Sequence, residues 1–133
     1  MVERYFGRIF GSRQRGRACN AALVSYSRPV VKTLSPEQAQ ALISSGECEV
    51  VDVREPREWS RGHVPGARLV SFDRIRQSPK SALPRDGVIF VCAAGVRSQA
   101  AAKVAAESGY SNVYNLGGGT RNWVSHGLPL VQD

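Results

Sequence analysis

The stretch that decides the fold is FVCAAGVRSQAAAKVAAESG, residues 90–109. It completes an apolar run, VIFVC, that predicts a buried strand. An alanine-rich segment follows and predicts a helix from Ser98 to Ser108, with Gly109 as its stop. Cys92 stands between the two, at the carboxyl end of the expected strand. A thiol in this place faces the start of a helix, whose free N–H groups and dipole favour negative charge.

The segments around this stretch alternate between helical and strand patterns. A helix is expected after Ser35, which suits the N-cap, with Gln38 completing a capping box and Gly46 as its stop. Residues 49–53, 68–72 and 112–116 predict further strands, and 56–67 a short helix followed by a loop. Residues 73–87 predict one helical turn and a loop, and a last helix ends at Gly127.

This alternation predicts an α/β fold: one domain with a mostly parallel sheet of about five strands and helices on both faces. In open parallel sheets, sites form at the carboxyl ends of the strands. Cys92 is expected at such an end, so the same pattern that predicts the fold also points to the site.

Charge is unevenly distributed along the chain, which has 133 residues and a net charge of +7. Residues 1–28 hold six arginines and one acidic residue, a net charge of +5, and the remainder is nearly balanced at +2. We expect residues 1–29 to be a flexible basic extension and residues 30–133 to form the domain. No specific nucleic-acid partner is expected, although binding by the extension stays open as a weaker alternative. No apolar run approaches the roughly 18 residues of a membrane span.

Three cysteines, Cys19, Cys48 and Cys92, form no C-x-x-C pair, which favours a reducing compartment over a disulfide framework. With two histidines in the chain, no metal-ligand spacing is present and no metal is expected. Residues 1–29 lack the apolar core of a secretory signal. We therefore expect a cytoplasmic protein, or one of an organelle matrix if the extension is a transit peptide.

The loop after Cys92 has the composition of an anion cradle. A thiol becomes a good nucleophile as the thiolate, and a helix start or a nearby cation lowers its pKa from about 8.5. Small residues let successive N–H groups converge on one point, and an arginine adds a permanent positive charge. The alternative, a cysteine buried as an ordinary apolar residue, does not explain this coincidence. The predicted anion-binding loop consists of Ala93, Ala94, Gly95, Val96, Arg97 and Ser98.

Four motifs together resemble a single-domain rhodanese. They are VVDVREPREW, GHVPGA, CAAGVRS and LGGGTRNW, and the resemblance covers about residues 32–131. It implies a sulfurtransferase that moves a sulfane sulfur from thiosulfate or a persulfide to a thiophilic acceptor, such as cyanide or a thiol. Cys92 would be the nucleophile that carries the sulfur as a persulfide, with no metal or organic cofactor. A sulfur-donor or sulfur-acceptor protein is a further implied partner.

Two other functions remain as alternatives. Cysteine phosphatases read H-C-x5-R, whereas here Val91 replaces the histidine and Arg97 comes one position too early. The shorter loop suits a single sulfur atom better than a tetrahedral oxyanion. The second alternative is a non-catalytic rhodanese-like module for protein interaction or for sulfur relay within a complex.

Three charged residues near the first strand are predicted to support the site. Asp52 lies in an apolar run, and a buried carboxylate must be paired or hydrogen-bonded. We expect it to hold loop backbone or an arginine rather than to act as a general base, and Arg54 and Glu58 to belong to the same support. The glycines at 117–119 are expected to form a tight turn that brings backbone close to the Cys92 pocket.

Overall fold

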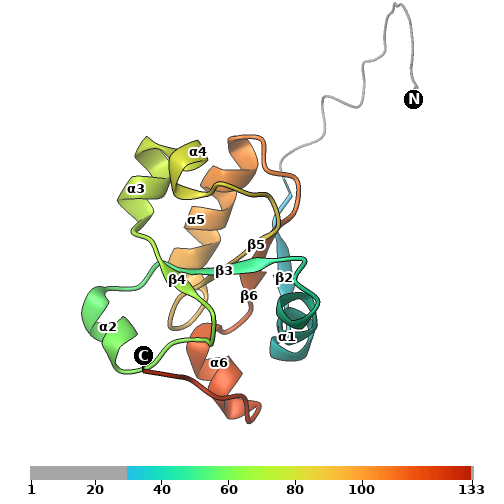
Figure 1. Ribbon diagram of the computed structural model, residues 1–133, viewed down its shortest axis with the longest axis vertical. Coiled ribbons are helices and arrows are strands. Elements are labelled where there is room, and N and C mark those ends of the chain that lie inside the picture. Colours follow the sequence, from blue (N-terminus) through green and yellow to red (C-terminus); the bar gives the residue numbers. More distant parts are fainter. Residues whose placement is uncertain (1–29, 133) are drawn as a thin grey trace, which may run out of the picture.

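A computed structural model describes residues 30–132 and contains a five-stranded parallel sheet (Figure 1). The strand order is β2-β6-β5-β3-β4, and each neighbouring pair is parallel. The strands are β2 (Lys32–Leu34), β3 (Glu49–Asp52), β4 (Arg68–Leu69), β5 (Val88–Val91) and β6 (Val113–Leu116). The predicted α/β class and parallel sheet are therefore confirmed.

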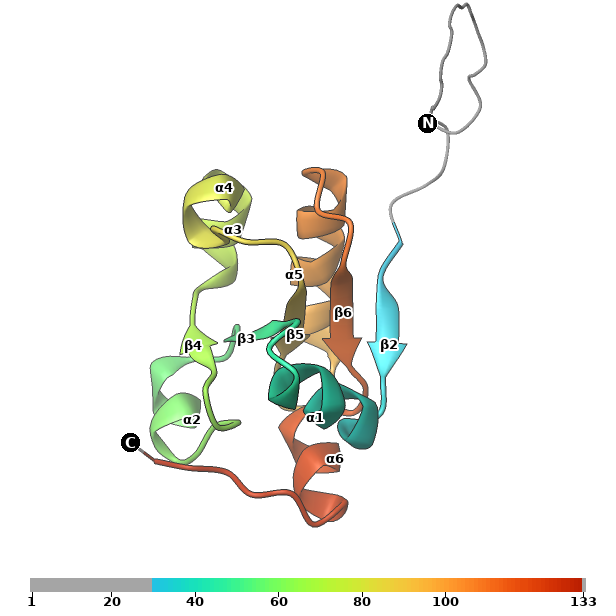
Figure 2. The same cartoon turned by 45° about the vertical axis from the view of Figure 1, so that its right-hand side comes forward.

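Helices cover both faces of the sheet (Figure 2). One face packs against α3 (Phe72–Gln77), α4 (Pro79–Ala82) and α5 (Val96–Glu107). The other packs against α1 (Pro36–Ser44) and α6 (Gly119–Ser125), and α2 (Pro56–Ser60) follows β3. All four residues of β5 are buried, which explains its continuous apolar run. Their side chains alternate between the two cores: Val88 and Phe90 enter one, Ile89 and Val91 the other.

The structure differs from the sequence-based expectation in four elements. Strand β2 was not predicted, because Lys32 and Thr33 are exposed on this edge strand and only Leu34 is buried. Strand β4 has two residues rather than five. Residues 73–87 do not form a single turn and a loop, since α3 and α4 bury Ile75 and Ala82. Helix α5 begins at Val96, two residues earlier than predicted.

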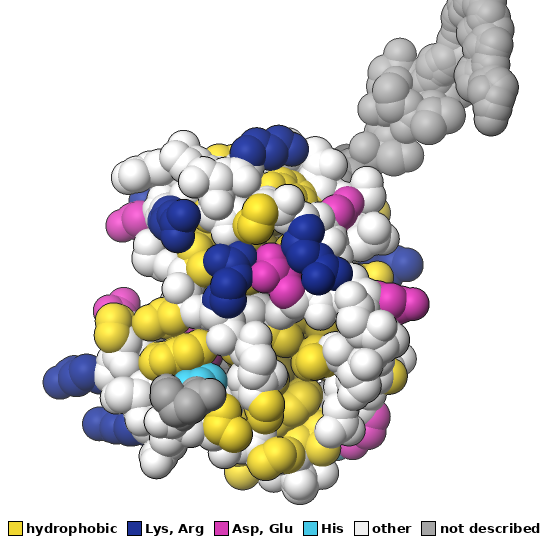
Figure 3. All heavy atoms as spheres, viewed as in Figure 1, with side chains coloured by type: hydrophobic (Ala, Val, Ile, Leu, Met, Phe, Trp, Pro, Cys, Tyr) yellow, Lys and Arg dark blue, Asp and Glu magenta, His cyan; other side chains and the backbone are white. Residues whose placement is uncertain are grey.

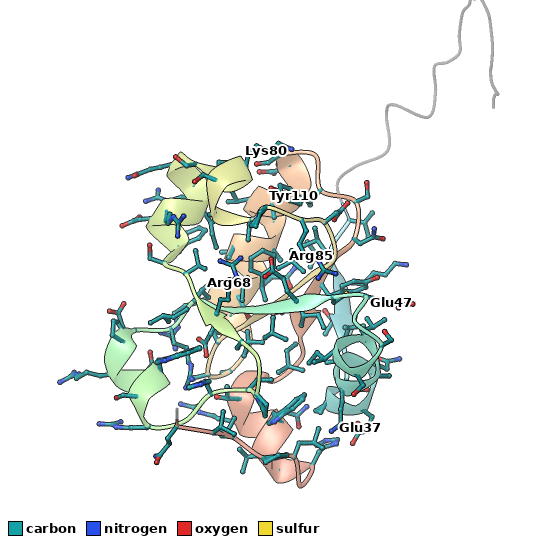
Figure 4. The ribbon with its side chains drawn as sticks, viewed as in Figure 1. Glu37, Glu47, Arg68, Lys80, Arg85 and Tyr110 are labelled. Atoms are coloured by element: carbon teal, nitrogen blue, oxygen red, sulfur yellow. The ribbon has the colours of Figure 1, made fainter. Side chains whose placement is uncertain are left out.

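The amino ends of the strands are tied together by polar contacts far from Cys92. The Tyr110 hydroxyl lies within hydrogen-bond distance of the carbonyl oxygens of Pro79 and Leu83, and its one proton can be donated to either. Arg85 donates to the carbonyls of Gly46 and Glu47, at 3.0 and 3.2 Å (Figure 4). On the face seen in Figure 3, basic and acidic side chains lie side by side instead of forming a uniformly basic surface. These hydrogen bonds stabilise loops at the end of the sheet opposite to Cys92.

A glycine turn joins β6 to α6 and comes into close contact with the loop after β5. Gly119 has a φ of +65°, and a Cβ built on it would lie 2.3 Å from the Cys92 carbonyl oxygen and 2.4 Å from the Ala93 carbonyl group. The expected approach of this glycine turn to the Cys92 loop is thus present. At Gly119, both the positive φ and the space require glycine.

Gly119→Ala is expected to destabilise the protein by more than about 3 kcal/mol, because the new methyl group meets backbone that cannot move independently. The free energy of unfolding in urea measures the effect. The matched control is Gly127→Ala, where φ is +80° but nothing lies within 4 Å of the added Cβ. It should cost about 1–2 kcal/mol for the left-handed backbone alone. Equal losses for the two variants would show that the contact with the Cys92 loop is not a constraint.

Candidate active site

Cys92 directly follows β5, the central strand of the sheet, and precedes the loop that leads to α5. Its side chain is buried, with the residue only 1% exposed. In the loop, Ala93 and Gly95 are half-buried and Ala94 is exposed. Gly95 has a φ of +99°, which turns the chain from the loop into the helix. The thiol thus lies beneath a thin loop of small residues.

Hydrogen-bond donors surround the sulfur. The Gly95 N–H donates to Cys92 Sγ at 3.0 Å, and the Ser98 hydroxyl lies 3.3 Å from the same atom. Burial acts to raise the pKa of the Cys92 thiol. The Ser98 hydroxyl and the backbone N–H groups of Ser98, Gly95 and Ala94 act in the opposite direction, and the net effect is a lowered pKa. Neutral donors thus favour the thiolate despite its burial.

Asn115 is the site residue that the sequence analysis missed. It is buried on β6, and its Oδ1 accepts from the Ser98 hydroxyl at 2.6 Å. Its amide nitrogen donates to the Gly95 carbonyl and to Gln99 Oε1, each at 3.0 Å. Asn115 therefore fixes both the loop and the hydroxyl beside the sulfur. A polar residue inside the apolar segment VYNL was the available signal, the same signal that singled out Asp52.

The Ser98 hydroxyl has one proton and two acceptors, Asn115 Oδ1 and Cys92 Sγ. While the thiol is protonated, Ser98 can donate to Asn115 and accept from the S–H group. Once the thiol ionises, the same hydroxyl proton can turn to the sulfur. Ser98 can therefore stay hydrogen-bonded in both protonation states of Cys92.

Arg97, which the sequence analysis predicts as a permanent positive charge in the loop, is paired with a carboxylate. Its two terminal nitrogens donate to the two carboxylate oxygens of Glu58, at 2.8 and 2.9 Å. The guanidinium also interacts with Cys92, and the Glu58 carboxylate is the main reason that the pKa of Arg97 is raised. Hydrogen bonds from Arg97 and from the Glu55 N–H lower the pKa of Glu58 to about 2. The positive charge beside the thiol is therefore largely compensated.

Asp52 and Arg54 form a separate, buried pair. Asp52 is 0% exposed, and Arg54 Nε donates to both of its carboxylate oxygens at 3.0 Å. The Arg54 N–H also donates to Asp52 Oδ1, and Arg54 Nη2 donates to the Gly62 carbonyl at 2.7 Å. This pair holds together the two ends of the segment that contains α2. Glu58 contacts Arg97 instead. The three predicted support residues therefore belong to two separate ion pairs, Asp52–Arg54 and Glu58–Arg97.

The start of α6 holds the loop from the other side. The Thr120 N–H donates to the Cys92 carbonyl at 2.8 Å, and the Arg121 N–H to the Ala93 carbonyl at 3.1 Å. Because these carbonyls are bound from outside, the following N–H groups of the loop can point at the sulfur.

Among residues 30–132, no group of three or more His, Cys, Asp or Glu side chains is arranged to hold a metal ion.

A groove of about 690 Å³ opens beside the loop. Its walls include Leu69 of β4, Val53 directly after β3, Phe72 of α3, and Val96, Arg97 and Ala100 of α5. Val96 is 77% exposed, compared with 51% for Val124. The groove thus places an apolar wall next to the residues that follow Cys92.

Ser98→Ala is expected to raise the pKa of Cys92, because it removes the largest of the interactions that lower this pKa. The thiolate fraction at neutral pH should fall, and the pH profile of iodoacetamide alkylation should move to higher pH. Ser108→Ala is the matched control, since that hydroxyl bonds Val104 at the other end of α5. An unchanged or lowered midpoint in Ser98→Ala would contradict a role of this hydroxyl in stabilising the thiolate.

A family model and individual relatives of known name both match most of this chain. The family model described as a rhodanese-like domain matches residues 35–126. The thiosulfate sulfurtransferase GlpE of Pseudomonas entomophila is 37% identical over 94 residues, which cover 71% of this chain and 85% of that protein.

Solved structures show the same fold. A rhodanese-related protein of Thermoplasma volcanium matches with a TM-score of 0.68 at 25% identity, over 77% of this chain and 99% of that one. A Rhodopseudomonas palustris protein, described as a possible tyrosine phosphatase, matches with a TM-score of 0.67 at 35% identity, over 76% and 85%.

These findings confirm the resemblance that the motifs indicated. The family model spans most of the described residues, and the predicted enzyme class is confirmed at the level of the family, since several relatives are named sulfurtransferases. The predicted extension, residues 1–29, lies outside the described residues, as does Cys19. This chain belongs to the rhodanese-like domain family.

Proposed function

We propose that this protein transfers a sulfane sulfur through a persulfide on Cys92. The observation that carries the proposal is the ring of neutral donors around a thiol whose pKa is lowered. Such donors stabilise a thiolate before the reaction and a negatively charged outer sulfur after it. The loop residues 93–98 serve as the cradle, with Arg97 at its rim.

The reaction has two half-reactions. The Cys92 thiolate attacks the sulfane sulfur of the donor, a new S–S bond forms, and the bond from that sulfur to the rest of the donor breaks. With thiosulfate the leaving group is sulfite, which takes the bonding electron pair. The persulfide then gives its outer sulfur to a thiophilic acceptor, cyanide or a thiolate, and the Cys92 thiolate is regenerated. A donor or acceptor protein is a further partner under this proposal.

The other side chains have positioning roles in this proposal. Ser98 donates to the sulfur, and Asn115 holds Ser98 and the loop in place. Asp52 and Arg54 fix the segment that carries Glu58, and Glu58 in turn fixes Arg97. Asp52 is fully buried against Arg54, an arrangement that favours support of the backbone over proton transfer with a substrate.

A reducing compartment is the proposed location, the cytoplasm or, if residues 1–29 act as a transit peptide, an organelle matrix. Cys48 and Cys92 are both free thiols, which supports this proposal. No helix in the described part of the chain is long and apolar enough to cross a membrane.

A non-catalytic module is the second candidate, and the small exposure of Cys92 favours it. A thiol at 1% exposure needs some opening of the loop before a donor can reach it. The phosphatase alternative has less support, since Arg97 is bound through both terminal nitrogens to Glu58 and is not free to hold a phosphate.

Cys92→Ser is expected to abolish the formation of thiocyanate from a sulfane donor and cyanide. Intact-mass spectrometry should show that the wild-type protein gains the mass of one sulfur atom and that the variant does not. Cys48→Ser is the control, because burial raises the pKa of that thiol and it lies away from the loop. It should retain both the activity and the added sulfur.

Turnover by Cys92→Ser would exclude the proposed nucleophile. A wild-type protein that takes up no sulfur from thiosulfate, a thiosulfonate or a persulfide would favour the non-catalytic module. Hydrolysis of para-nitrophenyl phosphate in the absence of sulfur transfer would favour a phosphatase.

A further inference from the structure

Both arginines that line the groove, at the start of α5 and after β3, already bind a carboxylate. Arg97 binds Glu58 through two hydrogen bonds, and Arg54 binds Asp52. Glu55 lines the same groove and adds negative charge, and Asp73, also in the lining, is paired with Arg76. Among the lining residues, no positive charge is therefore left uncompensated for an incoming anion. A doubly charged donor meets a less favourable field here than a singly charged one.

The shape of the groove gives a second, independent indication of the donor. Its volume of about 690 Å³ falls within the range of pockets that bind organic ligands, far above the needs of a five-atom inorganic ion. Its walls include Val53, Leu69 and Phe72, together with Val96, the first residue of α5. An apolar group attached to the donor sulfur would cover the exposed Val96 side chain.

We infer that the preferred donor is a small organic molecule with a singly charged sulfane sulfur, a persulfide or a thiosulfonate, and that Glu58 is a specificity-determining residue that disfavours dianions such as thiosulfate. The inference rests on the proposed function. The amide cradle binds the sulfur that is transferred, and the groove binds the organic group. Because Arg97 is paired with Glu58, it does not bind the second negative charge of a dianion.

The chemistry is balanced for each type of donor. With a thiosulfonate, the Cys92 thiolate takes the outer sulfur and a sulfinate leaves with the bonding electrons. With an organic persulfide, a thiolate leaves in the same way. In both cases the leaving group carries one negative charge, whereas the sulfite released from thiosulfate carries two.

The test of charge compares thiosulfate with methanethiosulfonate, which is similar in size and carries one negative charge less. Glu58→Gln keeps an acceptor for the Glu55 N–H but releases Arg97 from its ion pair. It should raise kcat/KM for thiosulfate about tenfold and for methanethiosulfonate less than about threefold, because a freed cation interacts more strongly with the dianion. Cyanide serves as the acceptor in each assay.

Glu49→Gln is the matched control. It also releases an arginine, Arg68, from a pair of hydrogen bonds with one carboxylate, but neither residue lines the groove. It should leave the preference between the two donors within about twofold, because the freed charge lies away from the groove. A proportional change for both donors in Glu58→Gln, or none, would overturn the assignment of Glu58, as would an equal shift of preference in Glu49→Gln.

The test of shape compares methanethiosulfonate with benzenethiosulfonate, two donors of equal charge, and does not depend on the folding of a Glu58 variant. Wild-type kcat/KM should be at least about fivefold higher for the larger donor, and Val96→Ser should remove most of this advantage, because less apolar area is covered. Equal values for the two donors in the wild type would overturn the role of the groove.

The outcomes separate this inference from the proposed function. If the wild-type protein forms the Cys92 persulfide but shows neither preference, sulfur transfer stands and the inference fails. If neither these three donors nor an organic persulfide adds sulfur to Cys92, the proposed function fails first.

Discussion

The site depends on how the backbone after β5 is held. The carbonyl groups of Cys92 and Ala93 are bound from outside by the N–H groups of Thr120 and Arg121. Asn115 holds the Gly95 carbonyl from the sheet. With its carbonyls fixed in these directions, the loop presents N–H groups to the sulfur, and a buried thiol becomes more acidic rather than less. A loop without these outer contacts would leave burial as the main influence on its pKa.

This arrangement relies on neutral donors more than on a cation. Arg97 is close to Cys92, but most of its charge is balanced by Glu58. Fixed amide dipoles suit the proposed reaction, in which the negative charge moves by one sulfur atom, because they need not reorganise as it moves. An unpaired arginine would bind any anion at the mouth of the site, including a released leaving group. In the inference proposed above, the ion pair lowers the affinity for anions in general and raises the selectivity among them.

The fold could be predicted wherever an apolar run or a capping motif specifies an element from residues close together in the chain. The continuous apolar run of β5 and the capping box of α1, which Ser35 and Gln38 form in the structure, were readable because local chemistry specifies them. Strand β2 could not be predicted from its own residues, since its pairing with β6 places an exposed lysine and threonine in the sheet. Helices α3 and α4 have few residues, and their stability comes from packing Ile75, Ala82 and Leu83 into the core.

The sequence by itself determined the α/β class, the position of Cys92 at the end of a strand, and the small-residue loop that follows it. These features depend on residues close together in the chain, whose propensities act locally. The tertiary structure decided the partners: Glu58 for Arg97, 39 positions away, and Asn115 for Ser98, 17 positions away. Hydrogen bonds and ion pairs act over a few ångströms in space, so only the packing of β6 and α2 around the loop could determine which of the polar residues meet.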